Sequence, residues 1–188
     1  MSVNQIRLDD GEKRIVLALS SATRIKENNI ALVREVTGQG ITIIYVGANM
    51  PSRYLTDLFA KRDVDISRVA FIDCITKYAV GSVPDVPGNT RFISHPGNFT
   101  DLGIAITEML KKYSGEDVLI FIDSINAMLI HASSDSLIKF IHFLTSKLRL
   151  MEVRGIILAV ETGLDPVLFS HLTSFTDEVL TIGDDVQA

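Results

Sequence analysis

Seven short apolar runs alternate along the chain with longer segments that have helical periodicity. Several of the runs are apolar at successive positions, which is typical of strands buried on both faces of a parallel sheet. The runs occupy residues 14–20, 41–47, 68–74, 91–95, 117–123, 155–161 and 177–183. Because the intervening segments are about the right length for crossover helices, the pattern predicts an α/β fold with a mostly parallel central sheet.

The clearest helix prediction covers residues 133–150, SSDSLIKFIHFLTSKLRL. Its apolar positions recur every three or four residues and predict one buried stripe, with Ser133 or Ser134 as the N-cap. The stripe consists of Leu137, Phe140, Ile141, Leu144 and Leu148. The segment 75–90 breaks the alternation, and its two prolines and two glycines predict a surface loop.

The composition fits one such domain and leaves apolar residues to spare. The 188 residues are 47% hydrophobic with a mean hydropathy of +0.29, which suits a sheet covered on both faces and predicts some apolar surface for a partner. We expect a single domain over residues 1–188, with a core of about 12–183. The polar N-terminus and the lack of a long apolar run predict a cytoplasmic protein without a membrane contact. A net charge of −5 makes nucleic acid an unlikely main ligand.

Polar residues follow most of the predicted strands, where open parallel sheets bind their ligands. Each one by itself is explained as a solvated or capping residue, but together they predict a polar rim and a present or ancestral site. The rim consists of Ser20, Ser21, Gly47, Ala48, Asn49, Asp73, His95, Asp123, Ser124, Glu161 and Thr162.

The turn SSATRIKE, residues 20–27, stands where a phosphate-binding loop would connect the first strand to the first helix. Such a loop reads G-x-x-x-x-G-K-[ST], because its glycines let backbone N–H groups close on the phosphates. Here Ser20 and Ile25 occupy the glycine positions, Lys26 the lysine position and Glu27 the hydroxyl position. Glu27 places a carboxylate at a helix N-terminus, where it could substitute for the missing phosphate.

The segment DVLIFIDSINAML, residues 117–129, looks like a Walker B strand that ends in Asp123 and Ser124. Together with SSATRIKE, YVGANMPSRYLTDLF and GIILAVETG, it resembles the KaiC-like branch of the RecA-type ATPases over roughly residues 10–185. The segments HPGNFTDLGIAITEMLKK and FIHFLTSKLRL resemble uncharacterised archaeal members of that branch. The resemblance implies a RecA-like three-layer fold.

The resemblance also implies where the chemistry would be. Working relatives place paired glutamates after the second strand, whereas residues 46–49 read Val-Gly-Ala-Asn. We therefore expect a catalytically inactive RecA/KaiC-like interaction or regulatory module that needs no cofactor and assembles with itself or with another RecA-like protein. The alternative is a nucleotide-binding protein or slow ATPase with an altered phosphate loop, which would use ATP and magnesium.

Other candidate sites carry weaker signals. The four histidines, His95, His131, His142 and His171, lack the close spacing of metal ligands. Asp123 and Glu161 could share a metal or a proton if their strands are neighbours. Cys74 ends a predicted strand and is expected to be a small buried residue, and Ser124 lacks the G-x-S-x-G elbow of a hydrolase.

Overall fold

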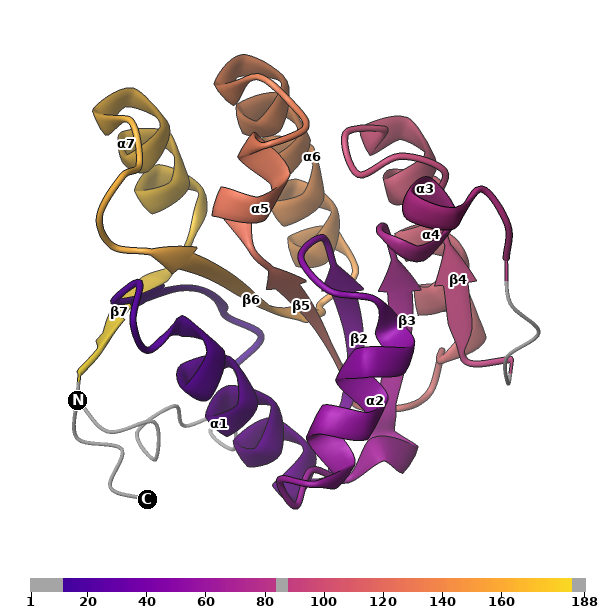
Figure 1. Cartoon of the computed structure of the whole chain (residues 1–188). Coiled ribbons are helices and arrows are strands. Elements are labelled where there is room, and N and C mark those ends of the chain that lie inside the picture. Colours follow the sequence, from indigo (N-terminus) through magenta and orange to yellow (C-terminus); the bar gives the residue numbers. More distant parts are fainter. Residues whose placement is uncertain (1–11, 84–87, 184–188) are drawn as a thin grey trace.

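The computed structural model describes residues 12–83 and 88–183. All seven predicted runs contribute a strand to one sheet, in the order β4-β3-β2-β5-β6-β1-β7 (Figure 1). The strands are β1 (Ile15–Ser20), β2 (Thr42–Gly47), β3 (Val69–Asp73), β4 (Thr90–Phe92), β5 (Val118–Asp123), β6 (Arg154–Val160) and β7 (Glu178–Ile182). Every pairing between neighbours is parallel, which confirms the predicted α/β fold.

Helices cover both faces of the sheet, as Figure 1 shows. One face carries α1 (Ile25–Gly38) and α2 (Ser52–Ala60), and the other carries α4 (Phe99–Lys112), α6 (Ser134–Leu150) and α7 (Pro166–Phe175). The short helices α3 (Thr76–Val80) and α5 (Ile125–Leu129) and the 3₁₀ turn η2 (Ile66–Arg68) complete the connections. The result is a helix–sheet–helix sandwich of three layers.

Two hydrophobic cores explain why the strand sequences do not alternate. Successive residues of a strand point to opposite faces. Ile15 and Leu17 of β1 belong to the core under α4, α6 and α7, whereas Val16 and Ala18 belong to the core under α1 and α2. Within the part of the chain that the structure describes, no helix is long and apolar enough to cross a membrane.

The structure corrects two of the predicted boundaries. The run 91–95 does not form a strand through His95, because β4 ends at Phe92 and the chain turns before Pro96. The segment 75–90 is not a plain loop, because it contains α3, which ends at Gly81 with a left-handed φ of 73°. Its residues 84–87 lie outside the described part.

The predicted N-cap and buried stripe of α6 are confirmed. Ser133 is the N-cap, and its Oγ accepts a hydrogen bond from the Ser136 amide. All five residues of the predicted stripe are buried in the core under α6. A capped start and one continuous apolar stripe therefore determined this helix locally.

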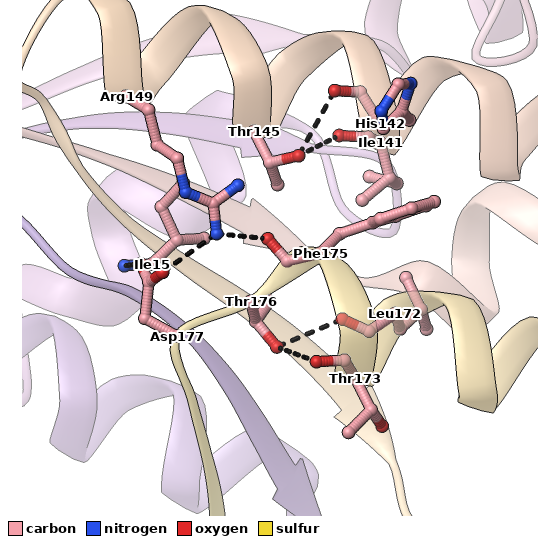
Figure 2. A network of polar contacts seen from close by, with 10 residues as sticks. All are labelled: Ile15, Ile141, His142, Thr145, Arg149, Leu172, Thr173, Phe175, Thr176 and Asp177. Carbon is pink, nitrogen blue, oxygen red and sulfur yellow. Dashed lines mark hydrogen bonds and ion pairs between the residues drawn. The ribbon is translucent and has the colours of Figure 1, made fainter.

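The C-terminal ends of α6 and α7 are tied to the start of β1 by a polar network (Figure 2). The Arg149 guanidinium donates to the Phe175 carbonyl and to Asp177 Oδ1, each at 2.8 Å. Asp177 Oδ2 in turn accepts from the Ile15 amide at 2.8 Å. Burial works against the charged carboxyl, but the hydrogen bonds from Arg149 and Ile15 outweigh it and lower the pKa of Asp177.

Candidate ligand site at the carboxyl ends of the strands

The carboxyl ends of the strands form one edge of the sheet, and four of them end in residues of the predicted rim. These are Ser20 of β1, Gly47 of β2, Asp73 of β3 and Asp123 of β5. Gly47 pairs in register with both Asp73 and Asp123, so the two aspartates flank the end of β2. Strand β6 lies between β1 and β5 and separates the phosphate-loop position from Asp123 by one strand.

Asp123, the predicted Walker B aspartate, is buried in a hydrogen-bond network. Its Oδ2 accepts from the Tyr45 hydroxyl at 2.5 Å, and that hydroxyl accepts from Asn29 Nδ2 at 2.8 Å. Burial raises the pKa of the Asp123 carboxyl, although the hydrogen bonds from Tyr45 and Asn29 oppose the shift. Burial and the nearby Asp123 charge raise the pKa of Tyr45 well above its ordinary value.

Aromatic packing holds the Tyr45 ring in this position. The ring stacks on Phe121, with centroids 5.2 Å apart, and meets the edges of Phe59 and Phe71 at 5.6 and 5.7 Å. Because Tyr45 and Phe121 are opposite each other in the β2–β5 register, the hydroxyl reaches the residue two positions further along β5. The aspartate is thus held by a side chain that the sequence analysis did not select.

Residues 21–24 form a compact turn between β1 and α1. The Arg24 amide donates to the Ser21 carbonyl at 3.1 Å, and the Asn28 amide donates to the Arg24 carbonyl at 2.9 Å. None of residues 20–27 has a positive φ, since the non-glycine residues with that conformation in the described chain are Asp63 and Glu152. A nest of N–H groups that cradles an anion alternates right- and left-handed residues, and this turn does not.

The two charged residues at the start of α1 have partners on or next to α2. Glu27 accepts hydrogen bonds from Arg62 at 2.8 and 3.4 Å. Its negative charge is therefore balanced by a guanidinium in addition to the backbone amides at the start of α1. Lys26 is exposed, and its Nζ lies 6.0 Å from the centroid of the Tyr54 ring. These contacts join α1 to the α2 side of the site.

A narrow crevice remains between α1 and the segment that follows β2. Lys26, Asn29, Asn49 and Asp123 are its polar lining residues, and Ile25 is among the apolar ones. Its volume is about 30 Å³, which is room for about one water molecule. Asn29 Oδ1 is buried and has no hydrogen-bond partner among the described residues.

Two other residues of the rim have capping roles. Asp73 accepts from the amides of Ser52, Ile75 and Thr76 and from the Thr76 hydroxyl, at 2.6–2.9 Å. Burial opposes its charge, but these hydrogen bonds lower the pKa of Asp73. Ser124 is the N-cap of α5 and accepts from the Ala127 amide.

The remaining predicted rim residues do not line the crevice. His95 packs edge-on against Tyr78 and His131, with ring centroids 5.0 and 5.8 Å away. Glu161 and Thr162 are exposed beyond the end of β6. Strands β5 and β6 are neighbours, but Leu158 stands opposite Asp123 in their register. Among residues 12–83 and 88–183, no group of three acidic, histidine or cysteine residues is arranged to hold a metal.

Tyr45 and Asn29 belong to the candidate site but were not predicted from the sequence. Both have a signal in the sequence, because a tyrosine interrupts the aliphatic run TIIYVG and an Asn-Asn pair stands in the first turns of α1. A polar residue in a fully buried strand needs a partner. The partner of Tyr45, however, is 78 residues away.

Solved structures support a RecA/KaiC-like fold. The uncharacterized protein PH0321 from Pyrococcus horikoshii, in complex with an unknown peptide, has a TM-score of 0.69 at 12% identity, covering 90% of this chain and 77% of that one. The KaiC-like protein PH0186 from Pyrococcus horikoshii OT3 has a TM-score of 0.63 at 14% identity, covering 94% of this chain and 75% of that one. At these identities the likeness shows the fold alone.

No curated protein matches the sequence. A family model does match residues 32–182, which is most of the chain, and its description is "Family of unknown function (DUF7504)". The protein therefore belongs to the DUF7504 family.

Proposed function

We propose that the protein is a catalytically inactive RecA/KaiC-like domain that acts as an interaction or regulatory module. The observation that carries the proposal is the use of Asp123. In the family that the sequence resembles, this aspartate would support magnesium, whereas here its carboxylate is buried against the Tyr45 hydroxyl. The adjoining crevice of about 30 Å³ is far too small for a nucleoside triphosphate.

The start of α1 is also poorly suited to phosphates. A phosphate bound there would lie beside the Glu27 carboxylate, and Lys26 would offset only part of the repulsion. Like charges about 4 Å apart at an effective dielectric constant near 20 repel by about 4 kcal/mol, and the Arg62 ion pair and solvent around the partly exposed Glu27 side chain reduce that repulsion without removing it. Ile25 adds a branched side chain where a phosphate loop has glycine, so the residues present do not fit a magnesium nucleotide.

Hydrolysis would lack a water-orienting acid even if a nucleotide entered. The position after β2 carries Ala48, which is buried, and Asn49, which is exposed. Phosphoryl transfer depends on positioning the attacking water and on neutralising developing charge. Neither residue can accept the proton of that water at neutral pH.

The second candidate function is a nucleotide-binding protein or slow ATPase. One observation favours it, because Lys26 and Asp123 line the same crevice at the carboxyl edge of the sheet. It would require the crevice to open and the Tyr45 hydroxyl to release Asp123. We rank it second because both changes expose a buried hydrogen-bond network.

An interaction role is supported by apolar side chains that the cores do not use. Ile104, Ile130, Phe143 and Val167 are each about half exposed or more. The structural neighbour PH0321 was crystallised with an unknown peptide, which is compatible with a peptide-binding role for this fold. We propose a second copy of the chain or another RecA-like protein as partner, without a requirement for a cofactor.

The proposal is tested by calorimetric titration of the full chain with Mg-ATP, together with a phosphate-release assay. We expect no binding in the micromolar range and no steady turnover. Micromolar binding that is lost in Lys26→Ala but kept in the control Lys61→Ala would overturn the inactive assignment. Both lysines are exposed, so neither variant disturbs the core.

A further inference from the structure

Helices α4 and α6 lie on the face of the sheet opposite to α1 and α2 (Figure 1), and an open groove runs between them. Its volume is about 790 Å³, within the range of roughly 300–1,000 Å³ found for ligand-binding clefts. Phe99, Gly103 and Phe140 are among its lining residues, and so are Ile104 and Phe143, which are about half exposed. The Phe99 and Phe140 rings stack with centroids 4.6 Å apart and join the two helices.

Each of the two helices places one half-exposed apolar side chain in the groove, outside the stripe that covers the sheet. In α4 the sheet-facing residues include Leu102, Ile106 and Met109, which are buried. Ile104 is 51% exposed and Phe143 of α6 is 49% exposed. The core is covered without Ile104 and Phe143, so these two side chains are available for a contact outside the chain.

Two ion pairs at the groove are neutral in themselves. Glu108 pairs with Arg91 at 3.3 Å, and Lys139 pairs with Asp135 at 2.7 Å. Both pairs are exposed, and exposed pairs contribute little to stability. The net charge of the groove is therefore set by the remaining charged residues.

The remaining charges at the groove are positive. Lys111 lines it, and Lys147 lies next to the lining, with Nζ 5.8 Å from the centroid of the Phe143 ring. Neither lysine forms an ion pair within residues 12–83 and 88–183. The negative ends of the helix dipoles offset part of this charge, since both lysines stand in last turns. A positive end on an apolar groove stands out in a protein of net charge −5.

We propose that this groove binds an acidic amphipathic segment of a partner protein. The apolar side of the segment would contact Ile104 and Phe143, and an acidic side chain would meet Lys111 and Lys147. This inference rests on the proposed interaction function and names its surface and the chemistry of its partner. A second copy that used the same groove would bring its own lysines, so it complements the groove less well than an acidic segment does.

The test uses two fluorescent peptides of about 18 residues with leucine at a helical spacing of i, i+3, i+4 and i+7. One peptide has glutamate at the other positions and the other has lysine, and binding to the full chain is followed by fluorescence anisotropy at low salt. We expect the glutamate peptide to bind at least about tenfold more tightly than the lysine peptide. Raising the salt concentration should weaken that preference, because exposed charges are screened.

Matched variants then locate the site. Ile104→Glu should weaken binding of the glutamate peptide by about tenfold or more, because it adds a like charge to the apolar wall. Val167→Glu places the same charge on α7 at a residue that is 61% exposed, and should leave binding unchanged. Lys111→Glu should weaken binding, whereas Lys61→Glu, at the C-terminal end of α2, should not.

Three results would overturn the inference. These are no binding of the glutamate peptide up to about millimolar concentration, equal binding of both peptides, and equal loss in the α4 and α7 variants. Self-association in sedimentation that Ile104→Glu abolishes would assign the groove to a second copy instead. The Mg-ATP titration is independent of all these results, because the Asp123 crevice lies on the α1–α2 side of the sheet.

Discussion

The hydroxyl group of Tyr45 offers the sharpest test of the buried network. Tyr45→Phe removes this one oxygen and keeps the ring that stacks on Phe121. The oxygen makes two buried hydrogen bonds, one to Asp123 Oδ2 at 2.5 Å and one from Asn29 Nδ2 at 2.8 Å. The substitution therefore isolates the polar contacts from the aromatic packing.

The expected cost follows from those two contacts. A hydrogen bond to a charged acceptor contributes about 1.5–3 kcal/mol, and a buried donor left without a partner costs a further 1–3 kcal/mol, part of which water in the crevice recovers. We therefore expect Tyr45→Phe to lower the free energy of unfolding by about 2–4 kcal/mol. For a chain of this size that is a decrease in Tm of about 5–15 °C.

Urea unfolding at pH 7, followed by circular dichroism, measures this cost. Tyr54→Phe is the matched control, because Tyr54 is 48% exposed and should change stability by less than about 0.5 kcal/mol. Asp123→Asn and the double variant complete a cycle, in which the two single costs should not add, because the residues share one hydrogen bond. A Tyr45→Phe protein as stable as the control, or strictly additive costs, would refute the network as described.

The pH dependence of the same variants gives an independent check. The pKa of Asp123 is raised in the folded protein, mainly by burial, so the unfolded state loses its proton first. The contribution of Asp123 to stability is thus fully present below the ordinary value of 3.8 and falls as the pH rises through the folded pKa. The stability of the natural protein relative to Asp123→Asn should fall over that range, and a rise would contradict the assignment.

Three further predictions concern the rest of the carboxyl edge. In thermal melts, Gly97→Ala should lower the free energy of unfolding by about 1–3 kcal/mol, because the added Cβ would lie 2.5 Å from the His131 carbonyl oxygen. The control is Gly38→Ala, whose Cβ would meet no atom within 4 Å and which should be neutral or slightly stabilising. Asp73→Asn should lower the free energy of unfolding by about 2–4 kcal/mol at pH 7. Because the folded pKa of Asp73 is lowered, this loss of stability should shrink as the pH falls below about 3.8. A loss that stays constant in urea unfolding down to acid pH would contradict the capping role of the charged carboxylate. Glu27→Thr alone should not create tight Mg-ATP binding by calorimetry, whereas adding glycine at positions 20 and 25 should restore weak binding without turnover, and tight binding by the single variant would show that charge alone closes the site.

Local sequence determined the elements of the sandwich. Unbroken apolar runs predicted strands buried on both faces, and the two cores on β1 show why alternation is absent there. The cap and stripe of α6 were also readable, because a helix start depends on residues three positions apart and a stripe on a period of 3.6. The run 91–95 was misjudged because apolar content does not show where strand pairing stops, and β4 pairs over only three residues.

The candidate site was only partly readable. The strand ends Ser20, Asp73 and Asp123 were identified, since all parallel strands end at the same edge. Whether the Asp123 side chain faces a ligand or another side chain depends on which strand lies beside β5. The sequence does not show that this strand is β2. The Tyr45 hydroxyl reaches Asp123 because β2 pairs with β5, and Asn29 reaches the Tyr45 hydroxyl because α1 packs over β2.

The α4–α6 groove has the same origin. Periodicity shows which side of each helix is apolar, and the sequence alone predicted that some apolar surface would remain for a partner. Only the tertiary structure brings Ile104 and Phe143 to one groove and leaves both half exposed. The physical reason is that apolar periodicity and local geometry are properties of short segments, whereas a site is a relation between segments, and the order of the strands decides which segments meet.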